Sequence, residues 1–379
     1  IGRISYPMYL WHWPLIVFTI SVTGRPIDPF QAVILFGLTI GLSWASLVVL
    51  EQPIRTRRWL PARGRLFGVS AALSAVLVVV GLVAFNSRGM PWRLSPAERA
   101  LADISTELPE VDILCPGSRR GVAKDLPPCV LGDVKAEHYS FALLGDSHSR
   151  VMAASIGDVA AKAGVKGLYL GRIACPPLIG LDRRDEPNRH CAEHLLWALE
   201  RIRAENIDNV FVVARWGILI PPAQFGNERI ADIVFTKGGK TVPEAEERQV
   251  VKDALVATLD ALTGRRLTVL FSIPEAGYDV PMVQAAAKRF GWQPPVGSDR
   301  SLYERRQKKI RDLFAEVLLG RDGIEVLEPA NVLCGRGDCL LMKDGKLLYS
   351  DDDHVSRAGG ALLAPLFEPA LRRSTMARR

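Results

Sequence analysis

The first 90 residues of this 379-residue chain contain no lysine, no cysteine and only two acidic residues, Asp28 and Glu51. Eight arginines lie in the same region, so its charge is eight minus two, or +6, out of a net charge of +7 for the whole chain. A nucleic-acid-binding domain needs basic residues spread over a folded face. We therefore expect no nucleic-acid partner and interpret the basic region as a membrane anchor.

Three runs in this region have no Asp, Glu, Lys or Arg: residues 6–23, 30–50 and 66–85. Each approaches or reaches the ~20 apolar residues that a helix needs to cross a bilayer. We predict three transmembrane helices within residues 1–85. For the first run the alternative is a buried helix of a soluble protein, because Pro7 and Pro14 interrupt it.

The arginines also predict an orientation in the membrane. Five of them lie between the second and third runs, within 51–65, whereas the turn between the first and second runs has one Arg and one Asp. By the positive-inside rule, 51–65 is cytoplasmic and everything after about residue 86 is outside. Three runs before the globular part exclude a cleaved signal peptide, and the missing initial methionine suggests a fragment of a longer chain.

The cysteines test this topology independently, because all six fall in the portion expected outside. An even number confined to the exported side fits an oxidising compartment. The sequence has no C-x-x-C pair and no histidine at zinc-finger spacing, so we expect no metal site. Among 15 possible pairings, proximity along the chain favours Cys115–Cys129, Cys175–Cys191 and Cys334–Cys339.

Residues 86–135 are rich in Pro, Gly and charge with little periodicity, and we interpret them as a linker and a stapled loop. From 136 to 379, short β-rich runs alternate with amphipathic stretches, which predicts a parallel sheet with helices on both faces and ligands at the carboxyl ends of its strands. The predicted strands are 139–145, 166–170, 209–214, 267–273 and 324–327, and the predicted helices are 149–163, 191–205, 244–262, 302–318 and 356–372.

The first of these strands ends in LLGDSHSR, residues 143–150. Gly145 permits a sharp turn, and Asp146 can cap the following helix. Ser147 then stands at a helix N-terminus, where backbone N–H groups favour negative charge and can hold an oxyanion. Ser147 is a candidate nucleophile; the alternative is that Asp146 and Ser147 only cap the helix. His148 either shapes the pocket or packs at the helix end.

A second cluster, SDDDHVSRAGG at 350–360, stands just before the last predicted helix. An activated serine needs a base whose pKa is near neutrality and a carboxylate that fixes the tautomer of that base. His354 and Asp351, three residues apart across a turn, supply both from one loop. Asp352 or Asp353 remains open as the alternative partner or as a plain helix cap.

The GDSH segment and the D-x-x-H segment resemble the first and last signature blocks of the SGNH/GDSL hydrolase superfamily. The resemblance implies a three-layer, flavodoxin-like α/β/α domain with Ser147 as nucleophile, His354 as base and Asp351 as its orienting carboxylate.

The middle blocks of the superfamily, which supply two more oxyanion donors, are less well matched. The strand at 166–170 is followed by Gly171, a candidate for the glycine donor. The strand at 209–214 runs into ARWG with no asparagine, and Arg215 and Trp216 either line the site or pack at the strand end.

The membrane part, through SYPMYLWHWPLIV at 5–17 and EQPIR at 51–55, resembles the last helices of the acyltransferase family 3 membrane proteins, which acylate sugars of cell-envelope polysaccharides. The resemblance implies a bacterial inner-membrane protein with a periplasmic SGNH domain. It also implies a saccharide acceptor, O-antigen or another envelope glycan, and acetyl-coenzyme A as acyl donor to helices that precede Ile1. We expect no cofactor bound in this chain.

Three functions remain after this reasoning, and the oligomeric state stays open. The first is an O-acyltransferase that moves an acetyl group through Ser147 to a saccharide hydroxyl. The second is a membrane-tethered esterase that uses the same residues with water as acceptor. The third is a saccharide-binding module without catalysis.

Overall fold

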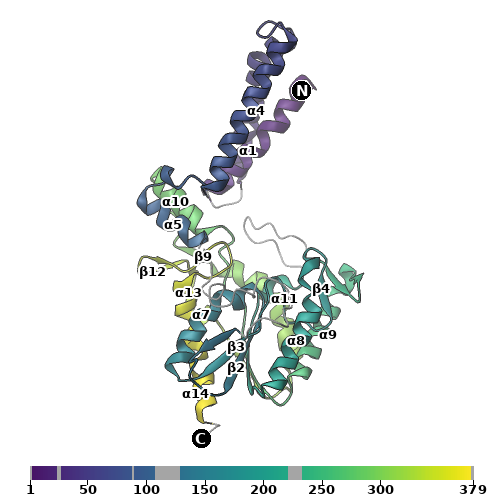
Figure 1. The fold of residues 1–379 in the computed structure, drawn as a ribbon, viewed down its shortest axis with the longest axis vertical. Coiled ribbons are helices and arrows are strands. Elements are labelled where there is room, and N and C mark those ends of the chain that lie inside the picture. The colour runs from purple at the N-terminus through teal and green to yellow at the C-terminus, as the bar shows by residue number, and fades with distance from the viewer. Residues whose placement is uncertain (1, 24–26, 88, 107–128, 221–232, 377–379) are drawn as a thin grey trace. The chain divides into compact units, whose positions relative to one another are not determined.

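The structure is a computed structural model that describes residues 2–23, 27–87, 89–106, 129–220 and 233–376. Its contacts divide the chain into two units. The first unit combines residues 1–105 with 282–294, and the second combines 106–281 with 295–379. In the described residues the first unit is helical, and all the strands belong to the second (Figure 1).

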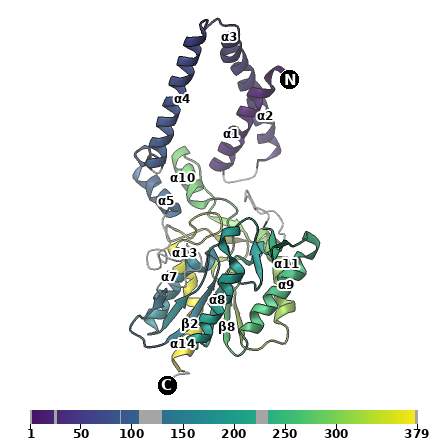
Figure 2. The same ribbon diagram turned by 45° about the vertical axis from the view of Figure 1, so that its right-hand side comes forward.

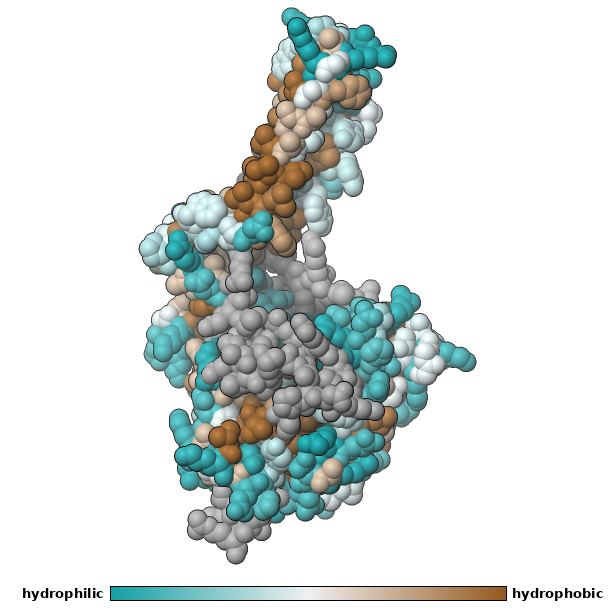
Figure 3. Space-filling view, viewed as in Figure 1, coloured by the Kyte–Doolittle hydropathy of each residue, from teal (hydrophilic) through white to brown (hydrophobic). Residues whose placement is uncertain are grey.

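In the first unit, α1 (Ser5–Thr23) pairs with α2 (Pro29–Ser46), and the Trp11 indole donates a hydrogen bond to Ser46 Oγ at 2.8 Å. The helix α2 starts at a capping box formed by Asp28 and Gln31 and continues through a π-helical turn into α3 (Gln52–Arg55). The helix α4 spans Arg63–Asn86 and exposes apolar side chains along its length, the brown band in Figure 3.

Two helices of the described chain, Pro29–Arg55 and Arg63–Asn86, are long and apolar enough to cross a membrane. They correspond to the second and third predicted spans. The first predicted span is helical as α1, but length and composition qualify only the other two, so its crossing of the membrane stays a prediction.

The remainder of the first unit brings together two amphipathic helices from distant parts of the chain. The helix α5 (Pro96–Thr106) lies inside the segment predicted as a linker, and Ser95 and Glu98 form a capping box at its start. Glu98 Oε1 also lies 3.7 Å from Arg289 Nε on α10 (Val280–Phe290).

A six-stranded sheet organises the second unit, in the order β1-β3-β2-β5-β8-β10. All strands but the antiparallel edge strand β1 run parallel. The winding reverses at β2, and in sheets of this kind ligands bind beyond the carboxyl ends of the strands at that point. The strands are β1 (Val130–Gly132), β2 (Tyr139–Gly145), β3 (Lys166–Tyr169), β5 (Asn209–Val213), β8 (Arg266–Leu270) and β10 (Ile324–Leu327).

Helices cover both faces of this sheet, as the parallel pattern predicts (Figures 1 and 2). On one face, Phe211 stacks between Phe141 and Phe367 at centroid distances of 5.0 and 5.1 Å. On the other face, Ala142 and Leu144 belong to the main apolar core. The first face carries α7 (Ser147–Lys162), α13 (Arg357–Leu363) and α14 (Glu368–Met376); the second carries α8 (Cys191–Ala204), α9 (Glu244–Ala261) and α11 (Arg300–Leu318).

All five predicted strands and the helices between them form, with one correction. The predicted helix 356–372 is interrupted by a 3₁₀ segment, Ala364–Phe367, because Pro365 cannot continue an α-helix. The sequence did not predict the smaller elements, which are two to four residues long: β4 (Leu181–Arg183), β6 (Phe235–Lys237), β7 (Lys240–Thr241), β9 (Gly297–Asp299), β11 (Asp338–Leu340), β12 (Met342–Lys343), β13 (Lys346–Leu347), α12 (Ala330–Leu333) and the 3₁₀ turns Gly2–Ile4, Pro91–Arg93, Pro187–Arg189 and Trp216–Ile218.

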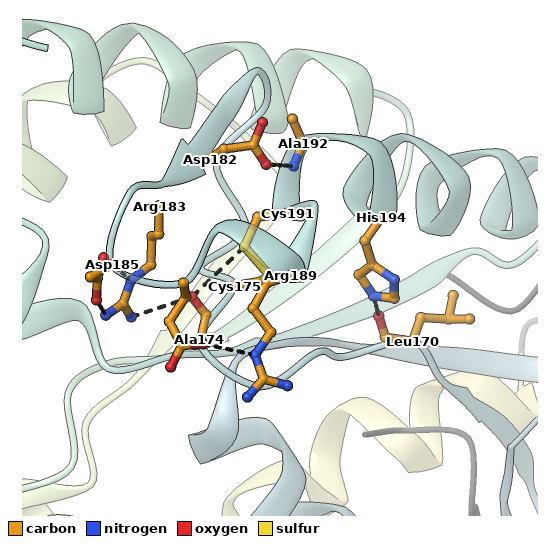
Figure 4. The surroundings of a disulfide bond; sticks show 11 residues. Leu170, Ala174, Cys175, Asp182, Arg183, Asp185, Arg189, Cys191, Ala192 and His194 are labelled. Carbon is orange, nitrogen blue, oxygen red and sulfur yellow. Dashed lines mark hydrogen bonds and ion pairs between the residues drawn. A yellow bond between two sulfur atoms is a disulfide. The ribbon is translucent and has the colours of Figure 1, made fainter. Parts of the chain in front are cut away.

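Two of the predicted disulfides are present, Cys175–Cys191 and Cys334–Cys339. The first ties the loop after β3 to the first residue of α8, where Asp182 accepts a hydrogen bond from the Ala192 N–H at 3.0 Å (Figure 4). Cys129 is also disulfide-bonded. Its predicted partner, Cys115, lies outside the described residues.

We expect loss of Cys175–Cys191 to destabilise the second unit more than loss of Cys334–Cys339. The two bonds close loops with sequence separations of 16 and 5, and in the chain-entropy model these restrict the unfolded chain by about 3 and about 2 kcal/mol. Chemical denaturation of the two Cys→Ser double variants measures this difference. Equal losses would contradict the loop-length argument.

Candidate active site

Ser147 is presented by a turn that only glycine can make. Gly145 ends β2 with φ of +140°, and a Cβ atom there would lie 1.7 Å from the Val213 carbonyl oxygen. The backbone at Gly145 therefore lies directly against that of the neighbouring strand β5. Ser147 becomes the first residue of α7, where the backbone N–H groups have no intrahelical partner.

Asp146 holds this turn from two sides. Its Oδ1 accepts a hydrogen bond from the His148 N–H at 2.9 Å and caps α7. Its Oδ2 accepts one from the Arg215 N–H at 2.9 Å, just beyond the end of β5. Asp146 is thus both the predicted helix cap and a bridge between the two strand ends that flank the site.

The loop that carries His354 is ordered by its own aspartate. Asp351 Oδ1 accepts hydrogen bonds from the backbone N–H groups of Asp353 at 2.9 Å and His354 at 2.6 Å. The carbonyl oxygen of Asp352 accepts one from the Ala276 N–H at 2.8 Å. The loop is thereby fixed internally and to the segment after β8, which orients the imidazole.

The structure brings Ser147, His354 and Asp351 into one hydrogen-bonded line. His354 Nε2 lies 2.7 Å from Ser147 Oγ, across 207 residues of sequence. His354 Nδ1 lies 2.7 Å from Asp351 Oδ2. A neutral imidazole with its proton on Nδ1 donates to the carboxylate and accepts from the hydroxyl. The arrangement has the contacts needed to move a proton from Ser147.

Two further groups extend this line beneath the surface. Asp353 Oδ1 lies 3.1 Å from His354 Nδ1, and Asp353 Oδ2 lies 2.9 Å from His148 Nε2 and 3.0 Å from Arg215 Nε. Burial raises the pKa of Asp353, but the charges of His354 and Arg215 and the hydrogen bond from His148 outweigh it, so its pKa lies well below the ordinary value.

The pKa of His354 is shifted in the opposite direction. Burial lowers it, but the charge of Asp353 and the hydrogen bonds to Asp351 and Asp353 outweigh burial and hold the pKa well above the ordinary value. For Asp352, burial, followed by the charges of Asp353 and Asp351, raises the pKa to about 7. The pKa values of Asp352 and Asp353, adjacent in the chain, are thus shifted in opposite directions.

The same cluster contains groups of the kind that bind metal ions. One ligand atom each from His148, Asp353 and His354 lies within 4.8 Å of the others. These side chains already hydrogen-bond one another through the atoms a metal would need. Their arrangement therefore suits proton transfer directly.

The predicted pocket residues have different positions. Gly171 follows β3 where a Cβ would lie 2.4 Å from Ser149 Oγ, and the next N–H, of Arg172, donates to the Gly145 carbonyl at 2.8 Å. Gly171 is therefore beside the Ser147 turn. Trp216 is only 1% exposed, and its indole donates to the Leu270 carbonyl at 2.8 Å, which favours strand-end packing over pocket lining.

Arg215, the other candidate at this strand end, belongs to a buried set of charges that the sequence reasoning missed. Its Nε lies 2.8 Å from Glu275 Oε1, and Glu275 also forms an ion pair with Arg306 on α11. Asp353 had been an open alternative in the SDDDH run. Glu275 and Arg306 stand in no motif, so only the fold reveals them.

Comparison with known proteins identifies the family. Residues 115–369 match the family of the SGNH domain (fused to AT3 domains). No curated protein matches the sequence. The chain is similar to the periplasmic domain of a lipopolysaccharide acetyltransferase from Salmonella ser. Paratyphi A, with 15% identity, a TM-score of 0.47 and coverage of 62% of this chain and 85% of that one.

A second similar structure is described as a platelet activating factor from Streptococcus pneumonia, with 13% identity, a TM-score of 0.33 and coverage of 63% of this chain and 86% of that one. Neither similarity is strong enough to assign an activity. The family match spans well over half of the chain and agrees with the parallel sheet and the two apolar helices. The chain belongs to the family of SGNH domains that are fused to AT3, acyltransferase family 3, domains.

Proposed function

We propose that this chain is part of a membrane-bound O-acyltransferase that carries a short acyl group, acetyl in the simplest case, on Ser147 and transfers it to a saccharide hydroxyl. The observation that carries the proposal is the line of two 2.7 Å contacts from Ser147 through His354 to Asp351. Fusion of this family to acyltransferase domains supports transfer as the overall reaction.

In the first half-reaction, Ser147 Oγ attacks the acyl carbonyl carbon and His354 Nε2 takes the hydroxyl proton. Asp351 stabilises the resulting imidazolium. The bond to the donor's leaving group then breaks, and that group receives the proton from His354. In the second half-reaction a saccharide hydroxyl attacks the acyl-serine and its proton passes to His354. The bond between the acyl carbon and Ser147 Oγ then breaks, and Ser147 Oγ takes that proton from His354, which restores the free enzyme.

Two backbone N–H groups are suited to hold the oxyanion of both half-reactions. The Ser147 N–H begins α7, where the helix dipole favours negative charge. The Gly171 N–H has no hydrogen-bond partner in the part of the chain that the structure describes. We assign both as oxyanion donors. Arg215 is not needed for this role, because its guanidinium lies between Asp353 and Glu275.

The membrane part supplies the acyl group in this proposal. We propose that the chain crosses a bacterial inner membrane three times, the first time as α1. The positive-inside rule supports a cytoplasmic position for residues 51–65 and a periplasmic one for the SGNH domain. Acetyl-coenzyme A donates acetyl to acyltransferase helices on the cytoplasmic side. The acceptor is O-antigen or another envelope glycan.

Trapping the acyl-enzyme tests the proposal. The purified protein is mixed briefly with p-nitrophenyl acetate, quenched in acid and digested. Mass spectrometry should find a 42 Da acetyl increment on the peptide that contains Ser147, and a purified envelope glycan should remove it faster than buffer does. An increment on another residue, or none, would overturn the proposed nucleophile.

The second candidate function, a periplasmic esterase, uses the same three residues with water as acceptor. The half-buried His354, with a side chain 23% exposed, is accessible enough for water to attack the acyl-serine. If water removes the acetyl group as fast as every glycan offered, and cells with the full protein gain no glycan acetyl groups, the chain is an esterase.

Activity should rise with pH through the pKa of His354. Only the neutral imidazole accepts the Ser147 proton, and the charge of Asp353 together with the hydrogen bonds to Asp351 holds the pKa above the ordinary histidine value of 6.5. The midpoint of kcat/KM for p-nitrophenyl acetate should therefore lie above pH 6.5. A midpoint at or below that value would contradict the electrostatic environment described for His354.

A further inference from the structure

The imidazole of His354 contacts two carboxylates, although base catalysis of this type needs one. Its Nδ1 lies 2.7 Å from Asp351 Oδ2 and 3.1 Å from Asp353 Oδ1. The Asp351 side chain is 37% exposed, whereas that of Asp353 is 5% exposed. A buried charge acts through a lower effective dielectric than an exposed one, so Asp353 acts more strongly on the imidazole per unit charge.

Asp353 is built into the structure as an ionised group. Its Oδ2 is shared by His148 Nε2 at 2.9 Å and Arg215 Nε at 3.0 Å, while its Oδ1 faces the catalytic imidazole. The donors come from α7 and from the end of β5, so three separate segments meet on one carboxylate. An isolated buried carboxylate would take up a proton instead.

Arg215 is in turn held by a second buried carboxylate. Glu275 Oε1 lies 2.8 Å from Arg215 Nε, and Glu275 pairs with Arg306, whose side chain is 1% exposed. Charges of alternating sign thus run from α11 to the catalytic base. Burying this row of charged side chains costs desolvation energy that apolar packing would avoid. Its presence next to His354 therefore points to a role in the reaction.

We propose that Asp353 is a second carboxylate that acts on the base His354 and that Arg215 is a positioning residue that fixes the place of Asp353 and offsets part of its negative charge. This inference rests on the proposed function of Ser147 and His354. Asp351 fixes the orientation of the ring through the loop that it orders, and Asp353 sets how strongly the ring binds its proton. Arg215 partly neutralises Asp353, so that the imidazolium can release its proton again.

The variants Asp353→Asn and Arg215→Met should shift the protonation midpoint of His354 in opposite directions. Loss of the Asp353 charge removes stabilisation of the imidazolium and moves the midpoint down by about 1 pH unit or more. Loss of the Arg215 charge removes the cation that offsets the negative charge of Asp353, which still has His148 as a hydrogen-bond donor. The full negative charge then stabilises the imidazolium and moves the midpoint up. Asp353→Glu keeps the charge, so its midpoint should lie closer to that of the parent protein than to that of Asp353→Asn.

The midpoint is measured in the full chain in detergent by NMR of ¹⁵N-labelled histidine, which reads the ring without turnover. The pH dependence of Ser147 phosphonylation by a fluorophosphonate provides a second reading. The side chains that contact His354 are Asp351 and Asp353 of its own loop and Ser147 and His148 of α7, and Arg215 is linked to it through Asp353. Asp158→Asn on α7, which breaks an exposed ion pair with Arg357 of α13, is the matched control and should leave the midpoint unchanged.

Midpoints that stay within 0.3 pH units of the parent in both charge variants, or that move in the same direction, would overturn the proposal. Circular dichroism shows whether each variant is folded. If Asp353→Asn does not fold, Arg215→Met decides alone, because an unchanged or lowered midpoint there contradicts the role of Arg215. Failure of the proposed function gives a different result. In that case Ser147→Ala stays active, while the protonation midpoint of His354 still shifts when Asp353 is replaced.

Discussion

Replacement of Ser147 by alanine should lower both acyl transfer and p-nitrophenyl acetate hydrolysis by about three to six powers of ten. The loss is large because the hydroxyl is the only group of the Ser147–His354–Asp351 line that can form an ester. The remaining groups are left in place: His354 keeps its 2.7 Å contact with Asp351, and Gly145 still shapes the turn. Steady-state rates and the acetylation of the Ser147 peptide measure the effect.

The control for this variant is Ser301→Ala. Ser301 also lies in the first turn of a helix, α11, but it is exposed and its hydroxyl contacts Arg305 at 3.0 Å. Its loss should leave the rates within about twofold, since it touches no group of the site. If Ser147→Ala keeps a tenth or more of the activity, the covalent route through this serine is wrong for both the transferase and the esterase.

Replacement of Gly145 by alanine should destabilise the domain by about 3 kcal/mol or more and abolish activity. The added methyl group would occupy the space 1.7 Å from the Val213 carbonyl oxygen, which is backbone of the central strand β5 and cannot rotate away. The φ of +140° also strains any side chain at this position. Denaturant unfolding and soluble yield measure the first effect, and ester hydrolysis the second.

Gly337→Ala is the matched control, because an added Cβ there meets nothing within 4 Å and no left-handed backbone is needed. It should change stability by no more than about 0.5 kcal/mol. If Gly145→Ala is as stable and as active as Gly337→Ala, the turn can accept a side chain despite its contact with β5. The claim that this contact positions Ser147 would then be wrong.

The positions of the main strands along the chain could be anticipated because most of their residues are buried between the two helix layers. Runs such as 139–145 are continuously apolar, and the turn residues around them mark their ends. The strands β4, β6 and β9 have three residues each, too few to show a period. Their pairing depends on which loops the main sheet brings together, so it becomes visible only in the folded domain.

The site was predictable to the extent that its chemistry lies in short segments. Ser147 follows a strand and His354 precedes a helix, and both positions can be inferred from sequence. Asp351 follows from the D-x-x-H spacing, and its Oδ2 lies 2.7 Å from His354 Nδ1. The second contact, from Asp353, cannot be inferred in this way, because it depends on where His148 and Arg215 lie. Asp353 is buried against both of them, and neither stands near it in the sequence.

Trp216 and α10 show the same limit. An aromatic residue at the end of β5 can face either the site or the core, and the hydrogen bond from its indole to Leu270 decides for the core. The helix α10 lies in the sequence between β8 and β9, yet most of it belongs to the unit that is otherwise formed mainly by residues 1–105. No local sequence pattern predicts that a helix will associate with residues so far away in the sequence.

The 207 residues between the serine and its base have a consequence for biosynthesis. Ser147 directly follows the first parallel strand of the domain, β2, and His354 lies in the loop before its last helices, so a ribosome completes one long before the other. Under the proposed function, the nascent polypeptide therefore has a serine hydroxyl without its proton acceptor until the last helices dock. The serine and its base therefore come together only when the whole domain has been synthesised and folded.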